Sequence, residues 1–338
     1  MSRPLRVVVA SDAIGPLDSA QAGVAIARGW ADHAQVAVVP LAESGPPLAR
    51  ALAALLDGEP VLTDEGWWLR TGDTLAVGLN LPAGEPEWDL SASSGGYGEW
   101  LTRCLETGPA PARLILDLTG VAALDGGAGL LAALGVTPSE LPAALAVVRQ
   151  RFEAAEVIGV IPADETDLRL LGLQGAVSRR GFAVRLDPAE LLAAESAMAR
   201  WLAALGVDDQ PGTGASGGAV AAVRALGGRV LRGTELCAEL AGLARTLSLA
   251  DAVITGCTDF HIGNRGGQVV RFVADLAVDV QRPCLVFARE SSLSRREMRT
   301  FGVESAHTCE PGPLPESLTA AAVRVAQGWT APAERGVD

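Results

Sequence analysis

The first 60 residues alternate strand, helix and strand patterns in the order that a parallel sheet requires. A β-branched run over residues 5–10 predicts a buried strand, and a D-x-x-Q capping signal at Asp18 and Gln21 predicts a helix over residues 19–30. A second apolar run over residues 35–40 completes a strand–helix–strand unit. The sequence therefore predicts a doubly wound α/β sheet whose ligand-binding loops follow the carboxyl ends of its strands.

The pattern changes between residues 61 and 244 and then returns to regular alternation. Short apolar runs at 67–70 and 74–79, broken by Gly and Pro, predict β-hairpins. We therefore expect two α/β domains with a ligand-binding cleft between them. The first is discontinuous and consists of residues 1–60 and 245–338, and the second is inserted over residues 61–244.

The charged residues restrict the chemistry of the chain. Its net charge of −13 arises from 40 acidic and 27 basic residues, and every basic residue is an arginine. Nucleic acids bind basic surfaces, so this balance argues against a nucleic-acid partner. A chain without lysine has no Walker lysine, Schiff base or lysine general base. A phosphate or carboxylate must then be held by arginine, by backbone N–H groups or by a metal ion.

Other residue classes exclude further functions. The five cysteines contain no C-x-x-C pair and the three histidines lie far apart, so neither a disulfide framework nor a zinc site is expected. No segment approaches the roughly 20 uninterrupted apolar residues of a membrane span. The N-terminus leads directly into a strand pattern without a secretory leader, so we expect a cytoplasmic protein that does not contact membranes.

Three aspartates follow predicted strands or lie in the loops after them. Asp12, Asp125 and Asp259 occupy positions at which a carboxylate can hold Mg²⁺ or act as a general base. Glu43 follows the second predicted strand and is expected at the same edge as Asp12. Exposed loop aspartates often have neither role, so the pattern leaves both interpretations open.

Glycine-rich turns offer candidate anion sites. Residues 212–217 form a literal G-x-G-x-x-G, but residues 207–211 do not form the preceding strand that a dinucleotide fingerprint requires. The turn either holds an anion on its N–H groups or is a tight entry into the helix predicted over 218–226. The loops at 93–98 and 125–129 leave the same two alternatives. A G-x-S-x-G nucleophile elbow is absent from the sequence.

The order of these segments resembles the glycerate kinase family almost from end to end. The first strand and its loop resemble the opening I-A-P-D-S-F-K of that family, and the second resembles V-P-x-A-D-G-G-E-G. The similar segments are VVVASD at 7–12, VPLAESG at 39–45, GYGE at 96–99, DGGAG at 125–129, LLGLQGA at 170–176, GTGASGG at 212–218 and ADAVITG at 250–256.

This resemblance implies a two-domain glycerate-kinase-like fold and phosphorylation of glycerate, or a related small hydroxy acid, by ATP with Mg²⁺. It implies catalytic roles for Asp12 and Asp125, with Asp125 also binding the metal. The residues implied to bind ATP are Gly126, Gly127, Gly212, Gly214, Gly217 and Arg265, and those implied to bind the substrate are Glu43, Ser94 and Asp259. A homodimer is one oligomeric state that the sequence leaves open.

Several polar positions of the family motifs carry other residues in this chain. The lysine after the first strand corresponds to Gly15, and the serine, threonine and asparagine of G-G-S-A-T-N-D correspond to Val121, Ala123 and Leu124. Loss of one such group typically lowers the rate of phosphoryl transfer about 10²–10³-fold. Arg265 is a candidate replacement for a lysine. The alternative is a catalytically degenerate relative, a pseudo-enzyme that binds a small molecule or a protein.

Overall fold

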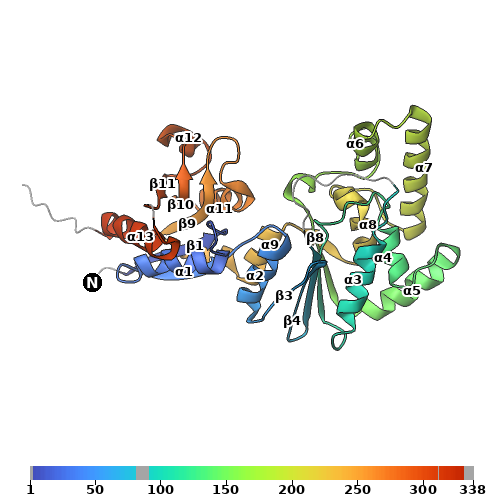
Figure 1. Ribbon diagram of the computed structural model, residues 1–338, viewed down its shortest axis with the longest axis horizontal. Helices are drawn as coiled ribbons and strands as arrows, with labels where there is room; N and C mark the ends of the chain where they lie inside the picture. Colours follow the sequence, from blue (N-terminus) through green and yellow to red (C-terminus); the bar gives the residue numbers. More distant parts are fainter. Residues whose placement is uncertain (1–2, 81–90, 311, 331–338) are drawn as a thin grey trace, which may run out of the picture. The chain divides into compact units, whose positions relative to one another are not determined.

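The computed structural model describes residues 3–80, 91–310 and 312–330, and it divides the chain into two compact units (Figure 1). The first unit consists of Met1–Glu43, Arg50–Leu55 and Thr234–Asp338, and the second of Ser44–Ala49 and Leu56–Gly233. Each unit has its own sheet covered by helices, which confirms the predicted α/β class. The inserted domain predicted over residues 61–244 includes residues 81–90, which lie outside the described residues.

The sheet of the first unit contains five parallel strands in the order β11-β10-β9-β1-β2. Its strands are β1 (Leu5–Ser11), β2 (Ala34–Pro40), β9 (Ala252–Phe260), β10 (Cys284–Ser291) and β11 (Ser305–Thr308). Strand β1 lies between β2 and β9, and the chain leaves β1 and β9 in opposite directions. The carboxyl ends of β1 and β9 therefore form the switch point at which α/β sheets bind ligands.

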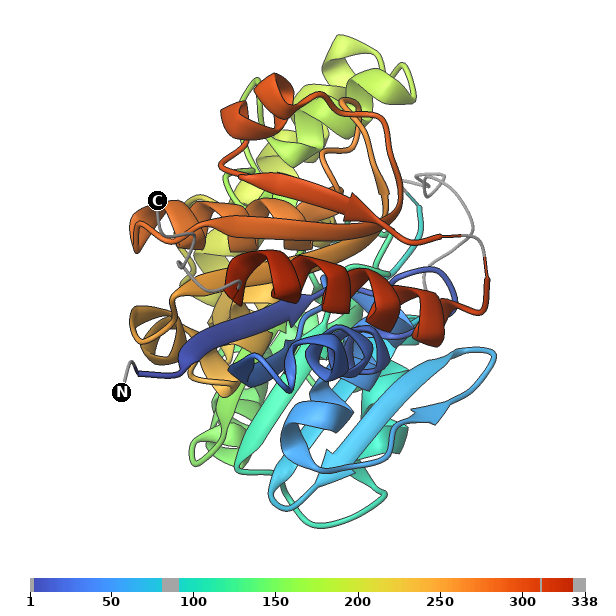
Figure 2. The ribbon, with the colours of Figure 1, turned by 90° about the vertical axis from the view of Figure 1, so that its left-hand side faces the viewer.

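Helices cover both faces of this sheet. On one face α1 (Ser19–Trp30) and α13 (Leu314–Thr330) lie side by side (Figures 1 and 2). Helix α11 (Gly267–Asp279) packs on the strands β9, β10 and β1, and none of its residues belongs to the apolar cluster that α1 and α13 form with the sheet. The capping box predicted for α1 is confirmed, because Asp18 and Gln21 exchange hydrogen bonds of 2.8 and 3.1 Å. The shorter helices are α2 (Gly45–Leu56), α9 (Gly233–Leu240), α10 (Leu243–Ser248) and α12 (Arg295–Thr300).

Two local predictions are corrected by the structure. The apolar pattern of residues 251–255 predicts a strand that ends there, but β9 continues to Phe260, because Asp259 pairs with Glu290 of the extended neighbour β10. The glycine and prolines of residues 43–47 predict a loop, but this segment contains the start of α2. Prolines are tolerated in that first helical turn because its N–H groups have no partner within the helix.

The second unit contains a six-stranded sheet in the order β3-β4-β5-β6-β7-β8. The predicted hairpins are confirmed as antiparallel β3 (Val61–Leu62), β4 (Gly66–Thr71) and β5 (Thr74–Leu79). The parallel part continues through β6 (Arg113–Asp117), β7 (Glu156–Val160) and β8 (Arg229–Leu231). Its α-helices are α3 (Gly95–Leu105), α4 (Ala128–Ala133), α5 (Leu141–Phe152), α6 (Ala176–Ala183), α7 (Pro188–Leu205) and α8 (Val220–Ala225).

Helix caps and apolar faces explain why these segments fold locally. Helix α7 begins with a capping box of Asp187 and Glu190 and ends at Gly206 in a left-handed conformation. Both sheets bury continuous apolar strands against helices, as parallel sheets do. No helix among the described segments of the chain has the length and apolar character needed to cross a bilayer.

Candidate active site

The predicted site residues fall into two sets, one in each unit. Asp12 belongs to the first unit and lies just past the carboxyl end of β1. Its N–H donates to the Gly256 carbonyl of β9 (3.3 Å), and the Gly15 N–H donates to the Thr258 hydroxyl (2.9 Å). These bonds tie the loop after β1 to the neighbouring strand. Asp12 thus lies at the switch point of the sheet, where a bound ligand is expected.

The environment of Asp12 suits proton transfer near neutral pH. Burial raises the pKa of Asp12 from 3.8 to about 6, and the hydrogen bond from the Ala13 N–H to Oδ1 (2.7 Å) offsets part of that rise. The side chain is half-buried and remains partly accessible to solvent. A carboxylate with a pKa near 6 is mostly ionised at pH 7 and is still basic enough to accept a proton.

Two predicted substrate-binding acids lie at the same edge of the first unit. Burial, followed by the charges of Glu43 and Asp12, raises the pKa of the Cys237 thiol to about 12. Burial, followed by the charges of Asp12 and Asp259, raises the pKa of the Cys257 thiol to about 12. Coulombic effects weaken with distance, so the acids that raise the pKa of a thiol lie close to that thiol. Asp12 is therefore close to Glu43 through Cys237 and close to Asp259 through Cys257.

A left-handed turn connects β9 to α11 beside these acids. Arg265, Gly266 and Gly267 have φ values of 50°, 78° and 84°. The Asn264 side chain stabilises the turn by accepting hydrogen bonds from the His261 N–H (3.1 Å) and the Gly266 N–H (2.9 Å). Helix α11 has 13 residues and begins at the switch-point edge. Its first N–H groups and the positive end of its dipole suit a phosphate group.

Two arginines lie near this edge of the first unit, one of them predicted to bind ATP and the other not predicted. The guanidinium of Arg265, predicted to bind ATP, lies 4.6 Å from the centroid of the Phe301 ring. Arg289, which the sequence analysis did not identify, extends from β10 toward the loop after β1. Its Nη1 lies 3.5 Å from the position that a Cβ on Gly15 would occupy. The sequence contained an indirect signal for Arg289. The chain has no lysine, and Gly15 at the lysine position of the family leaves space for an arginine from another strand.

In the second unit, the carboxylate of Asp125 joins two loops. Its Oδ2 accepts hydrogen bonds from the Ser94 N–H (2.8 Å), the Ser94 hydroxyl (2.9 Å) and the Gly129 N–H (3.0 Å). Its Oδ1 accepts one from the Gly127 N–H (2.9 Å). Helices α3 and α4 begin at these loops, so Asp125 holds the N-termini of both. The structure therefore brings the predicted residues Asp125, Ser94 and Gly127 into contact.

The Mg²⁺ role of Asp125 stays a prediction. Its Oδ2 accepts several hydrogen bonds, whereas its Oδ1 accepts one from the Gly127 N–H and keeps a lone pair for a metal ion. Within the described ranges, no group of three or more His, Cys, Asp or Glu side chains is placed to hold a metal ion.

The two predicted glycine turns of the second unit pack against each other. The Gly126 N–H donates to the Gly217 carbonyl (3.2 Å). A Cβ on Gly127 would lie 2.7 Å from the Cβ of Ala222, so α8 packs directly on the first turn. Gly126, Gly127 and Gly217 are all buried. These glycines allow close packing of backbone against backbone.

Five of the seven N–H groups of the turn at 212–218 donate to acceptors of the protein. The Ser216 N–H donates to Glu165 Oε2 (2.8 Å), and the Gly214 N–H donates to the Leu168 carbonyl (2.9 Å). Thr213, Ala215 and Gly218 donate to nearby carbonyls, and a Cβ on Gly212 would lie 3.1 Å from the Thr166 carbonyl. A carboxylate of the chain thus takes the Ser216 N–H, and ATP binding by Gly212, Gly214 and Gly217 stays a prediction.

A cavity of about 410 Å³ opens beside Ser94. Part of its lining precedes and begins α3, and part follows β6. The first part includes Ser93, Ser94 and Tyr97, and the second includes Val121 and Ala123. A largely apolar pocket with a few hydroxyl groups and a helix start is typical of small-molecule sites.

Asp117 is a buried acid to which the sequence analysis gave no role. Burial raises the pKa of Asp117 to about 6, although hydrogen bonds from Thr119 and Gly45 oppose that rise. Its Oδ2 accepts from the Gly45 N–H (2.6 Å) and its Oδ1 from the Thr119 hydroxyl (2.6 Å). Asp117 thereby connects the start of α2 to β6. The available signal was an acid within an apolar strand, followed two residues later by a threonine.

Comparison with known proteins covers nearly the whole chain. The sequence model of the glycerate kinase family matches residues 7–334. An uncharacterized protein of Mycobacterium bovis and one of Mycobacterium tuberculosis are each 31% identical to the chain over 333 residues, covering 89% of this chain and 83% of theirs. Glycerate 2-kinase of Escherichia coli is 26% identical over 334 residues, covering 84% of this chain and 85% of that protein.

A crystal structure from Salmonella typhimurium LT2 has a similar fold. It bears the name glycerate kinase 2, superposes with a TM-score of 0.71 and covers 97% of this chain and 99% of its own. The two sequences are 21% identical.

Proposed function

The chain belongs to the glycerate kinase family, and we propose that it transfers the γ-phosphoryl group of ATP to a hydroxyl of glycerate or of a related small hydroxy acid. The observation that carries this proposal is Asp12, a half-buried carboxylate with a pKa of about 6 at the switch point of the first sheet. An ATP-dependent reaction on a metabolite would act in the cytoplasm.

Asp12 acts as the general base in this proposal. The hydroxyl oxygen of the substrate forms a bond to the γ-phosphorus, the bond between that phosphorus and the bridging oxygen breaks to release ADP, and the hydroxyl proton passes to Asp12. Glu43 and Asp259, at the same edge, accept hydrogen bonds from other substrate hydroxyls. No step is assigned to a resident metal, because Mg²⁺ enters as part of the substrate MgATP.

The phosphates of ATP require positive charge and donors from a chain without lysine. The N-terminus of α11 supplies backbone N–H groups at the same edge as Asp12. Arg289, beside the Gly15 loop, supplies a guanidinium that is exposed and able to reach a bound anion. Asp125 and Ser94 hold the entrance loops of α3 and α4 in position beside the cavity of the second unit.

A second candidate function is a binding module without kinase activity. The observation that favours it is the occupation of predicted ligand groups in the second unit by the protein itself. Asp125 accepts hydrogen bonds from backbone and hydroxyl donors, and the Ser216 N–H binds Glu165. Apolar side chains at Val121 and Ala123 also replace donors that phosphoryl transfer would use.

The decisive experiment measures turnover and nucleotide binding with the same preparation. The purified full chain is incubated with D-glycerate, ATP and Mg²⁺ in an assay coupled to ADP release, and its thermal unfolding is followed with MgATP and MgADP. The kinase proposal expects ADP release that depends on glycerate, together with a nucleotide-dependent rise in Tm. Absence of both results would reject the kinase. Nucleotide binding without turnover on any small hydroxy acid would favour the binding module.

A further inference from the structure

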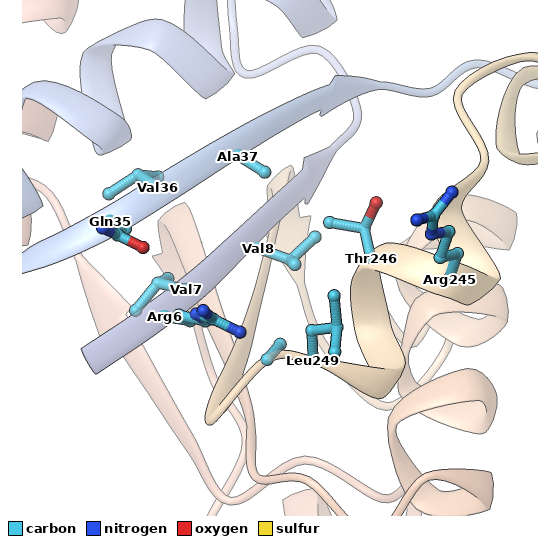
Figure 3. A pocket seen from close by; sticks show the side chains of 10 residues that line it. Arg6, Val7, Val8, Gln35, Val36, Ala37, Arg245, Thr246 and Leu249 are labelled. Carbon is cyan, nitrogen blue, oxygen red and sulfur yellow. The ribbon is translucent and has the colours of Figure 1, made fainter. Parts of the chain in front are cut away.

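The first unit has a groove at the amino-terminal half of its sheet (Figure 3). The groove has a volume of about 350 Å³ and lies between the strands β1 and β2 and the helix α10. Val8, Ala37 and Leu249 contribute apolar surface. Figure 3 shows the Arg6 side chain extending from β1 toward Leu249, with Arg245 one helical turn farther along α10. Two cationic groups therefore flank an apolar surface of small-molecule size.

This groove is separate from the edge that contains Asp12. It is lined by Arg6, Val7 and Val8, whereas Asp12 lies beyond the carboxyl end of the same strand. Asp12 lies four positions after Val8, the lining residue of β1 nearest to it, which corresponds to about 13 Å at roughly 3.3 Å per residue of strand. A small ligand in the groove would not reach Asp12.

The two arginines have no internal counter-ion. Over residues 3–80, 91–310 and 312–330, neither the Arg6 nor the Arg245 guanidinium takes part in a hydrogen bond or an ion pair. Asp251, close to Arg6 in the structure, is occupied by the Arg3 side chain and by the backbone N–H of Arg6. Two uncompensated guanidinium groups in a chain of net charge −13 form a local positive site.

We propose that this groove binds an organic dianion with a short apolar middle, with one anionic group at Arg6 and the other at Arg245. Guanidinium groups bind carboxylates and phosphates through charge-assisted hydrogen bonds, and the apolar surface would cover the carbon chain between them. Gln35 and Thr246 also line the groove and add side-chain donors. The site is independent of the proposed kinase activity.

The test titrates the full chain with succinate, glutarate and adipate, and uses butyrate and inorganic phosphate as probes of a single anionic group. Calorimetry reports affinity, and amide chemical shifts of Val7, Val8 and Thr246 report location. The expected result is saturable binding of at least one dicarboxylate, with shifts at these amides. Arg6→Gln and Arg245→Gln should each weaken this binding roughly tenfold or more.

Arg296→Gln is the matched control, because Arg296 is an exposed arginine of the same unit on α12. It should leave the affinity unchanged, as should Asp12→Asn, and the three arginine variants should unfold at the same temperature as the unaltered chain without ligand. The proposal is overturned if no dicarboxylate saturates, if butyrate or phosphate binds equally well, or if the shifts concentrate at Asp12 and Gly256. It is also overturned if sedimentation shows that the unaltered chain is a dimer and that Leu249→Gln is a monomer, because a second copy of the chain would then occupy the groove.

Discussion

At the scale of single residues, the pKa of Asp12 determines how the reaction should depend on pH. A general base must be ionised, so kcat/KM should rise with pH up to about 6 and then level off. Asp12→Asn removes the proton acceptor and should lower kcat about 10²–10⁴-fold. Coupled ADP release from pH 4.5 to 8.5 measures both effects.

The control for this prediction is Asp275→Asn, which removes an exposed aspartate from α11 in the same unit. It should retain the activity and the pH profile of the unaltered chain. Equal activity of Asp12→Asn and Asp275→Asn would show that another group accepts the proton.

Arg289 is the residue for which the structure suggests a role in place of lysine. Its Nη1 lies beside Gly15, three residues after Asp12. Arg289→Gln should lower kcat/KM for MgATP roughly 10²-fold, because it removes a charged donor to the phosphates. Arg265→Gln should have a smaller effect, since the Arg265 guanidinium stacks on Phe301.

Initial rates at varied MgATP measure this difference. Arg271→Gln, on the exposed side of α11, is the control for loss of one surface charge. If Arg265→Gln proved the more harmful substitution, Arg265 and not Arg289 would supply the charged donor to the phosphates.

At the scale of helices and loops, Asp125 stabilises the starts of α3 and α4 together. Asp125→Asn removes a negative charge from two helix N-termini and leaves one fewer acceptor oxygen for four short hydrogen bonds. We expect the free energy of unfolding to fall by about 1–3 kcal/mol. Urea unfolding measures this change.

Ser94→Ala separates the two roles of this contact. It removes the hydroxyl bond to Asp125 and the acceptor of the Leu130 N–H (2.9 Å), but it keeps the charge of Asp125 and the backbone bonds to it, so its loss of stability should be smaller than that of Asp125→Asn. Unchanged stability in Asp125→Asn would instead mean that the carboxylate is retained for chemistry and that the helix starts do not depend on it.

The turn at 212–218 contains backbone strain that one substitution should relieve. Ser216 has a φ of 52° and its buried hydroxyl has no hydrogen-bond partner among the described residues. Ser216→Gly should raise the free energy of unfolding by about 0.5–1 kcal/mol, the left-handed penalty less the extra chain entropy of glycine. Ser216→Ala keeps the strain and isolates the hydroxyl. A loss of stability in Ser216→Gly would contradict the assignment of strain.

The sequence was sufficient for features that depend on local contacts. The capping boxes of α1 and α7 could be predicted because their residues lie three positions apart. The extension of β9 to Phe260 could not, because it depends on pairing between Asp259 and Glu290 of another strand. The same limit applies to the site: Asp12 follows a recognisable strand, whereas Arg289 reaches Gly15 only through the order of strands in the sheet.

At the scale of the whole molecule, acidic groups of two kinds act in opposite directions on stability. Hydrogen bonds lower the pKa of Asp251, chiefly from the Arg6 N–H, and that of Glu156, chiefly from the Arg113 side chain. Such groups add stability that is lost as the pH falls through their folded pKa. Burial raises the pKa of Asp12 and Asp117 to about 6, and these two groups oppose folding once they ionise.

The opposing effects can be separated by comparing the unaltered chain with Asp12→Asn across pH. Between pH 4 and 6 the folded state binds the Asp12 proton more tightly than the unfolded state, so the contribution of Asp12 to stability falls as the pH rises. Removing that ionisation should leave stability equal at pH 4 and make Asp12→Asn more stable at pH 7, by at most about 3 kcal/mol. Urea unfolding at pH 4, 5, 6 and 7 measures the difference. A gain that is constant across this range would mean that Asp12 ionises normally in the fold, and a general base poised near pH 6 would then lose its physical basis.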